Sequence, residues 1–157
     1  MQSMKYRPTL AAAALGIAGA LTALPSAAQY RNADAAIKYR QSAMSLQGNH
    51  LARIFAMING QVPFDAKVAA DQTEIIATLN RLQFAAFIDG SDKGNTRAKP
   101  EIWSEKDKFK AAIAKSQEDV LKLAAAGKTG SLDQIKAAAG AVGESCKACH
   151  DAYQKPL

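Results

Sequence analysis

The chain has 157 residues, a formal net charge of +6 and two cysteines. A length of this order favours a single domain. The lysines and arginines are scattered without a basic run, which argues against nucleic-acid binding. The two cysteines, Cys146 and Cys149, lie in one short stretch. They cannot cross-link distant parts of a fold, so a structural disulfide framework is excluded.

The first 28 residues have the three-part pattern of a secretory signal peptide. A positive start at Lys5 is followed by an almost wholly apolar run over residues 10–24 and then by small residues. The apolar run has about 15 residues, fewer than the roughly 20 that span a bilayer. We therefore predict cleavage after Ala28, an exported mature domain of residues 29–157, and no membrane span after cleavage.

Four segments carry apolar residues at alternating spacings of three and four, the pattern of amphipathic helices. These segments are residues 32–59, 65–88, 104–126 and 131–153. Their expected N-caps are Asn32 or Asp34, Asp65, Ser104 and Ser131. The links are short except for residues 89–103, whose glycines and proline exclude a regular helix. The sequence predicts an all-α fold, an antiparallel up-down four-helix bundle.

The same spacing predicts which face of each helix is buried. The residues expected to face inward are Ile37, Met44, Leu51, Ile54 and Ile58 in the first helix, Val68, Ile75, Leu79, Leu82 and Ala86 in the second, and Phe109, Ile113, Val120 and Leu123 in the third. In the fourth helix the apolar stripe runs from Leu132 to Tyr153 and includes both cysteines.

Residues 146–150 read Cys-Lys-Ala-Cys-His, which is the pattern of c-type haem attachment. Residues i, i+3 and i+4 lie on one face of a helix. Both thiols can therefore bond the vinyl groups at one edge of a haem while His150 reaches the iron from the same side. We predict one haem c, bound covalently through Cys146 and Cys149, with His150 as axial iron ligand.

Other sites that use cysteine pairs fit the sequence less well. A structural zinc site needs four ligands, and His50 is the only other histidine. A thioredoxin-like redox pair needs a βαβ context, whereas the predicted fold is all helix.

A haem motif at the C-terminal end of a four-helix chain resembles class II c-type cytochromes, and specifically the cytochrome c′ family. The strongest pieces of the resemblance, which covers residues 29–153, are Tyr-Arg-Gln-Ser-Ala at 39–43, Lys-Pro-Glu-Ile-Trp-Ser at 99–104 and the segment 143–153 around the motif. The resemblance implies a soluble periplasmic homodimer with a five-coordinate haem below an apolar pocket. It also implies binding of nitric oxide and carbon monoxide, and a role in electron transfer or nitric oxide protection.

Arg40 interrupts the apolar stripe of the first helix. A buried charge needs a partner, and a haem propionate is the expected one, with Gln41 sharing the contact. The alternative is a side chain that extends to water. Met44, one turn further on, either packs in the core, covers the iron without bonding it, or bonds the iron through its thioether. The overall resemblance favours the non-bonding position.

Further candidates rest on weaker signals. Phe84 and Phe87 are expected beside the haem or in the core, and Thr96 or Lys99 beside a propionate. His50 is rotated about 240° from Met44 around the helix and is expected at the surface or an interface. Relatives often carry a basic residue four positions after the haem histidine. Gln154 stands there instead, which suggests a less positive proximal side.

Two functions follow from these residues. The first is a binding and redox protein whose haem has an open distal face for a small gaseous ligand. The second is an electron carrier in which Met44 and His150 both bond the iron. No acid–base pair or nucleophile constellation indicates an enzyme. For the expected homodimer, we predict that Ala52, Phe55 and Ile76 face the partner; the redox partner protein is unknown.

Overall fold

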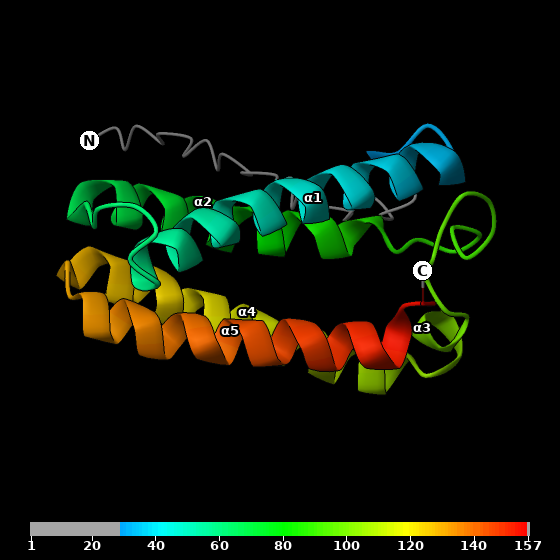
Figure 1. Ribbon diagram of the computed structural model, residues 1–157. Coiled ribbons are helices and arrows are strands. Elements are labelled where there is room, and N and C mark those ends of the chain that lie inside the picture. The colour runs from blue at the N-terminus through cyan, green and yellow to red at the C-terminus, as the bar shows by residue number, and fades with distance from the viewer. Residues whose placement is uncertain (1–28, 157) are drawn as a thin grey trace, which may run out of the picture.

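The computed structural model describes residues 29–156, so the predicted signal peptide lies outside the described residues. Four long helices are present: α1 (Ala33–Ile58), α2 (Ala66–Gln83), α4 (Lys106–Thr129) and α5 (Leu132–Tyr153). The 3₁₀ helix η2 (Phe84–Ala86) follows α2, and the short helix α3 (Glu101–Ser104) precedes α4. Successive long helices run in opposite directions, with α1 and α2 in one layer and α4 and α5 in the other (Figure 1). The predicted antiparallel four-helix bundle is confirmed.

Three of the predicted helix caps form as expected. Asn32, Asp65 and Ser131 each accept a hydrogen bond from the backbone N–H three residues later. The predicted cap at Ser104 is wrong, because Ser104 is the last residue of α3 and α4 begins after Glu105. Pro100 starts this extra turn, since its fixed φ suits a helix N-terminus. The connection predicted to lack regular helix therefore contains one short helix.

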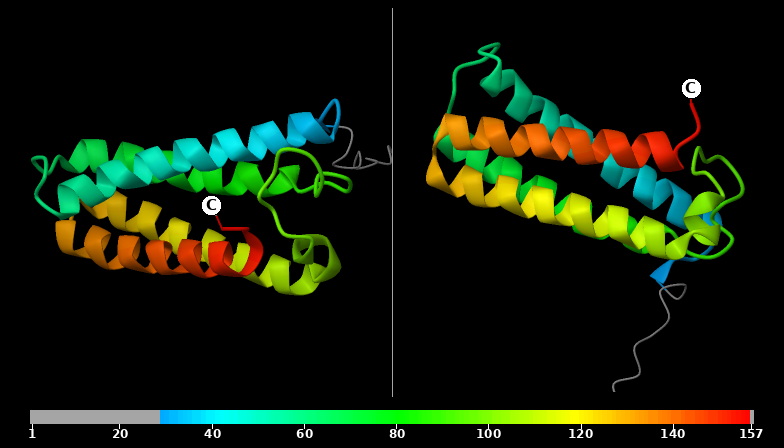
Figure 2. Two further views of the ribbon diagram at one scale, coloured as in Figure 1. Left: turned by 45° about the vertical axis from the view of Figure 1, so that its right-hand side comes forward. Right: turned by 90° about the horizontal axis from the view of Figure 1, so that it is seen from below.

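The packed core fills one end of the bundle. Its larger members come from the C-terminal half of α1, the middle of α2, the C-terminal half of α4 and the N-terminal half of α5; they include Ile54, Met57, Ile76, Val120, Leu123, Ile135 and Val142. The opposite end, where α1 begins and α5 finishes, carries the long connection between α2 and α4 (Figure 2). Among residues 29–156, no helix combines the length and apolar character needed to cross a membrane.

The predicted inner face of the second helix is wrong at three of its five positions, whereas Leu79 is half-buried and Ala86 is buried as predicted. Val68, Ile75 and Leu82 are exposed, and Ile76, predicted to face a partner, is completely buried in the core. The buried face of α2 also includes three polar residues, Thr73, Asn80 and Gln83. This helix has polar residues on its buried face and apolar residues on its exposed face, the reverse of the usual pattern. The spacing of its apolar residues therefore predicted the wrong inner face.

Candidate haem site

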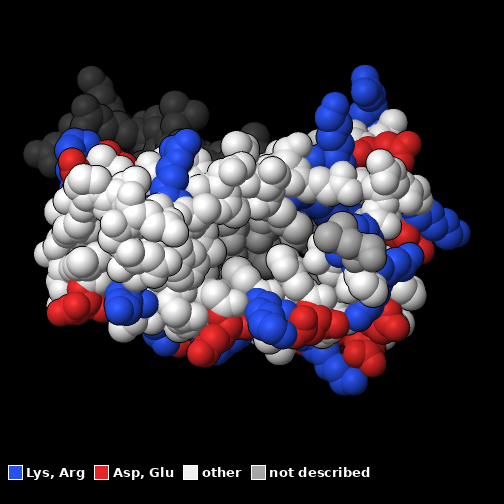
Figure 3. Space-filling model, in the orientation of Figure 1, with Lys and Arg blue, Asp and Glu red and all other residues white. Residues whose placement is uncertain are grey.

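A cavity of about 450 Å³ lies at the end of the bundle opposite the packed core. All four long helices and the connection between α2 and α3 line it; the residues are Arg40, Gln41, Met44, Gln47, Gly48, Leu51, Gln83, Phe84, Phe87, Thr96, Arg97, Ala98, Ile102, Phe109, Ser116, Cys146, Cys149, His150, Tyr153 and Gln154. Figure 3 shows a hollow between the two helix layers. Its volume falls in the range of ligand pockets, about 300–1,000 Å³. Nine of the ten candidate site residues named from the sequence line this one cavity, and only Lys99 does not; the nine are Arg40, Gln41, Met44, Phe84, Phe87, Thr96, Cys146, Cys149 and His150.

The helix α5 supplies the wall that carries the motif. It runs without a break through His150 to Tyr153, so Cys146 and Cys149 are separated by one helical turn and share a face. Both cysteines are half-buried. This is the arrangement in which two thiols and a neighbouring imidazole can reach one flat ligand from the same side.

Burial adjusts the ionisation of all three motif side chains. It raises the pKa of the Cys146 thiol, and the Asp119 carboxylate raises it further. Burial and Cys146 together raise the pKa of Cys149. The pKa of His150 is lowered, first by partial burial of the ring and then by the positive charge of Arg97. A lowered pKa keeps the imidazole neutral, which is the form that bonds a metal.

Arg97 supplies a positive charge near His150 that the sequence did not predict. Its Nε and one Nη donate to the backbone oxygen of Lys155, at 2.9 and 2.7 Å. The neighbouring Ala98 forms an antiparallel bridge with Gln154, which fixes the connection against the end of α5. Gln154 lacks a charge, but Arg97 lines the same cavity. The expected loss of positive charge on this side is therefore compensated from the connection.

Arg40 is 2% exposed and crosses from α1 to the connection that follows α2. Its guanidinium donates to the Ala86 oxygen (3.1 Å), the Ser91 hydroxyl (2.7 Å), the Ser91 oxygen (2.7 Å) and the Thr96 hydroxyl (2.9 Å). It also lies over the Phe87 ring, 4.6 Å from the centroid. The alternative in which Arg40 extends to water is wrong. Burial lowers the pKa of Arg40 to about 10.

The contacts of Arg40 leave its charge without a counter-ion. All four acceptors are neutral, and no carboxylate within residues 29–156 forms an ion pair with it. A buried cation at the cavity wall is the group expected beside an ionised carboxylate of a bound ligand. Exposed Gln41 also lines the cavity and donates to the Asn95 oxygen at 2.9 Å. The Lys99 ammonium instead donates to the backbone oxygens of Asp151 and Ala152.

Aromatic rings close the outer end of the cavity. Phe84 and Phe87 stack with their centroids 6.3 Å apart, and Phe109 meets both rings edge-on. Tyr153 extends the group from the end of α5, with its ring 5.1 Å from that of Phe109. Trp103 packs against Phe87 and donates its indole N–H to the Ile88 oxygen. These contacts give the cavity a rigid apolar wall.

Met44 and Leu51 line the cavity from α1 and are both half-buried. The layer formed by α1 and α2 faces the layer that contains α5 (Figure 1). Met44 therefore lies on the wall across from His150. His50 is not among the lining residues and is hydrogen-bonded to the Gln72 side chain at 2.6 Å.

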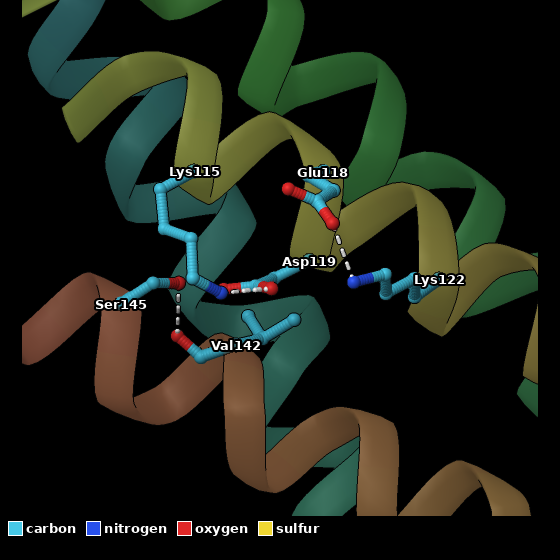
Figure 4. Close-up of polar contacts among 6 residues, drawn as sticks. All are labelled: Lys115, Glu118, Asp119, Lys122, Val142 and Ser145. Carbon is cyan, nitrogen blue, oxygen red and sulfur yellow. Dashed lines mark hydrogen bonds and ion pairs between the residues drawn. The ribbon is translucent and has the colours of Figure 1, made fainter. Parts of the chain in front are cut away.

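Three further residues of the cavity wall were missed in the sequence, together with one carboxylate that raises the pKa of Cys146. Gln47, Gln83 and Ser116 are buried cavity residues; each lies one helical turn from a predicted inward residue or site residue, a signal that was available but not used. Asp119 is 2% exposed and accepts a hydrogen bond from the Lys115 ammonium at 2.5 Å, beside the α5 helix (Figure 4). Its other carboxylate oxygen is buried without a hydrogen-bond partner.

A four-helix bundle with a cavity at one end, lined by Cys146, Cys149 and His150 of a Cys-Lys-Ala-Cys-His motif, defines a c-type haem protein of the bundle class. Comparison with known proteins narrows this class. A family model described as Cytochrome C' matches residues 35–154. The cytochrome c′ of Rubrivivax gelatinosus is 50% identical over 128 residues, which cover 81% of this chain and 99% of that protein. The chain belongs to the cytochrome c′ family.

Other relatives support the same assignment. The cytochrome c′ of Alcaligenes xylosoxydans xylosoxydans is 44% identical over 127 residues, which cover 81% of this chain and 98% of that protein. The crystal structure of the Rubrivivax gelatinosus protein superposes with a TM-score of 0.79, covering 81% of this chain and 100% of that one. A ferrous variant of the Alcaligenes xylosoxidans protein with bound nitric oxide superposes with a TM-score of 0.77 at 43% identity, covering 82% of this chain and 99% of that one.

The cofactor of the family is haem c, and the chain has two cysteines for its thioether bonds. The residues of the cavity fit this group on three counts. Both thiols and the His150 imidazole share one wall. A buried arginine without a counter-ion suits a propionate, and the aromatic rings suit an apolar macrocycle.

Proposed function

We propose that the protein is a periplasmic cytochrome c′ that binds nitric oxide and carbon monoxide at a five-coordinate haem iron and transfers electrons, rather than an enzyme. One observation carries the proposal: a single cavity has Cys146, Cys149 and His150 on one wall and only Met44 as a further iron-binding side chain on the opposite wall. Solved structures of the Alcaligenes xylosoxidans relative with bound nitric oxide and with bound carbon monoxide support it.

Different residues of the cavity would make different contacts with the haem. Cys146 and Cys149 would form the two thioether bonds, and His150 would bond the iron through a neutral imidazole. Arg40, with Gln41 beside it, would pair with a propionate, while Phe84 and Phe87 pack against the macrocycle. When bound, the haem would supply a redox-active iron that can take up a diatomic ligand. The polypeptide would orient it and limit which ligands reach it.

Covalent attachment is tested by removing one thiol at a time. Cys146→Ala and Cys149→Ala should each weaken haem retention during acid–acetone extraction, since each thiol forms one thioether bond. If either variant retained haem as firmly as the wild type, the two-bond assignment would need revision.

Met44 decides between this function and its alternative, a six-coordinate electron carrier in which the thioether bonds the iron. If Met44 only covers the iron, an incoming diatomic must displace it at a packing cost of about 1–3 kcal/mol. Met44→Ala should then raise the affinity for carbon monoxide by about 5- to 150-fold while the ferric absorption and EPR spectra stay high-spin. Met57→Leu is the matched control, because Met57 lies in the packed core of the same helix.

The alternative gives the opposite result. A bonded Met44 makes the wild-type ferric spectrum low-spin, and Met44→Ala converts it to high-spin with a large change in reduction potential, because the axial ligand is a main determinant of that potential. A low-spin wild-type spectrum at neutral pH would therefore reject the five-coordinate proposal.

We also infer a homodimer, on the outer surface of α1 and α2. Leu46, Val68, Ile75 and Leu82 are between 37 and 50% exposed, and the three on α2 recur every seven residues along one side of the helix. Ala52 is exposed on α1, whereas Phe55 packs partly against the core. Sedimentation velocity should give a dimer, and Ile75→Glu should give a monomer with unchanged haem spectra. A wild-type monomer at tens of micromolar would contradict the assignment.

A further inference from the structure

The carbonyl end of α5 is satisfied mainly by one lysine of the connection between α2 and α3. The last four carbonyl groups of an α-helix have no partner within the helix. In α5 the first of these, the His150 oxygen, accepts from a backbone N–H just beyond the helix at 3.0 Å. The Lys99 ammonium donates to the next two, the Asp151 and Ala152 oxygens, at 2.9 and 3.1 Å. The Lys99 backbone N–H donates to the last, the Tyr153 oxygen, at 2.9 Å.

Arg97, two positions before Lys99, brings a second cation to the same place. Its guanidinium donates twice to the Lys155 oxygen, and the Lys155 N–H donates back to the Arg97 oxygen at 2.8 Å. We name Arg97 and Lys99 the capping cations. Both are half-buried, and neither forms an ion pair in the part of the chain that the structure describes. Their positive charges at the end of α5 are therefore not cancelled by a bonded carboxylate.

The helix itself has no other cation for this task. Basic side chains in the last turn of a helix commonly interact with its terminal carbonyls. In α5 the only basic residue of the last turn is His150, whose imidazole faces the cavity and is the expected iron ligand. The connection therefore supplies the charge that the end of α5 lacks.

This charge lies where it can act on an iron bound to His150. The C-terminus of a helix carries a partial negative charge of about half an elementary charge, and such a charge favours ferric over ferrous iron. Two cations bonded at the same end reverse the sign of the local field. Their partial burial limits screening by salt. The pKa of His150 is lowered first by burial and then by the charge of Arg97, which agrees with a positive field at the ring.

We propose that the capping cations are positioning residues that raise the reduction potential of the haem held by His150. They stabilise ferrous relative to ferric iron, because the reduced cofactor carries one positive charge fewer. The connection after α2 therefore sets part of the potential, in addition to the motif on α5. The inference rests on the haem attachment and electron transfer of the proposed function, but it does not need an open iron position.

The test is a potentiometric titration of haem-loaded variants. Arg97→Gln and Lys99→Gln remove the charge and keep a hydrogen-bond donor. Each should lower the equilibrium constant for electron uptake about three- to tenfold, which is about 30–59 mV because tenfold corresponds to about 59 mV for one electron. Arg97→Lys and Lys99→Arg keep the charge and should stay within about twofold of the wild type. Lys136→Gln is the matched control, because Lys136 is an exposed lysine in the first half of α5; it should change the constant less than about twofold.

A purely structural cap gives a different pattern. Lys99→Gln would then lower the midpoint of thermal unfolding and leave the potential unchanged, and this result overturns the inference, as does an equal shift of the potential in Lys136→Gln. Arg97→Gln decides alone if Lys99→Gln fails to load haem, because Arg97 bonds a carbonyl beyond the last turn of α5. A low-spin wild-type spectrum would reject the five-coordinate proposal and leave this comparison valid, so the two failures are distinguishable.

Discussion

The hydrogen bonds of Arg40 give a direct test of how the connection after α2 is held. Arg40→Met removes four bonds of 2.7–3.1 Å to Ala86, Ser91 and Thr96 while keeping an apolar side chain in place. A hydrogen bond that involves a charged group contributes about 1.5–3 kcal/mol. Against this, the substitution removes the cost of burying a guanidinium, which is several kcal/mol. The stability lost with the hydrogen bonds to the charged group and the stability gained by no longer burying a guanidinium therefore largely cancel.

What remains is the cost of acceptors left without a donor. Ala86 and Ser91 are both completely buried, so two carbonyl oxygens lose a partner that water cannot replace, whereas the Ser91 hydroxyl keeps its hydrogen bond to the Ile88 oxygen. At about 1 kcal/mol each, the loss is about 2 kcal/mol. With a slope of about 4 kcal/mol per molar guanidinium chloride, the unfolding midpoint should fall by about 0.5 M.

The assay is guanidinium unfolding of the haem-loaded protein, followed by circular dichroism. Arg53→Met is the matched control, because Arg53 is an exposed arginine of the same helix; its midpoint should not move. Arg40→Lys keeps the charge but loses the planar fork, so an intermediate midpoint is expected. If the Arg40→Met midpoint stayed within about 0.2 M of the wild type, the reasoning from orphaned acceptors would be refuted.

Two other predictions use pairs of residues that differ in burial. A Cβ at Gly127 would collide with Thr73 on α2, whereas nothing lies within 4 Å of one at Gly140. Gly127→Ala should destabilise by about 1–3 kcal/mol and Gly140→Ala should stabilise by about 0.5–1 kcal/mol in thermal unfolding; equal effects would contradict the close contact of α2 with α4. Asp119→Asn should raise the reduction potential by about 40 mV, if its charge interacts with the iron by about 1 kcal/mol. Glu118→Gln should change it little, because this carboxylate is 59% exposed and paired with Lys122 (Figure 4). Equal shifts of the reduction potential in the two variants would mean that the burial of Asp119 does not strengthen its effect on the iron.

The fold could be predicted because its strongest determinants are local. Helix spacing and the caps at Asn32, Asp65 and Ser131 depend on residues within one turn, and all three caps formed. The errors arose where tertiary contacts decide. The sequence cannot show that α2 turns Ile76 inward and Ile75 outward, because apolar residues occupy both faces and only contact with α4 selects one.

The position of the cavity could be predicted from the motif, but only some of the polar residues that line it could be predicted. The cysteines and His150 follow from one helical segment, and Arg40 is conspicuous as a charge on an apolar stripe. Gln47 and Gln83 are different, because a glutamine in an amphipathic helix is usually solvated and its burial depends on how two helices cross. Arg97 is likewise invisible in the sequence, since its approach to His150 depends on the path of an irregular connection.

The up-down connectivity explains why these separate signals meet. In an antiparallel bundle the start of α1, the end of α2, the start of α4 and the end of α5 lie at the same end. A motif at the end of the last helix therefore faces residues near Arg40 and Phe84, although Arg40 precedes it by more than a hundred residues and Phe84 by about sixty. The same geometry brings the connection after α2 against the end of α5, where Ala98 pairs with Gln154. Arg97 thereby places a positive charge beside His150 from outside the helix that carries the motif, so the charge on this side of the cavity can change without any change in the motif itself.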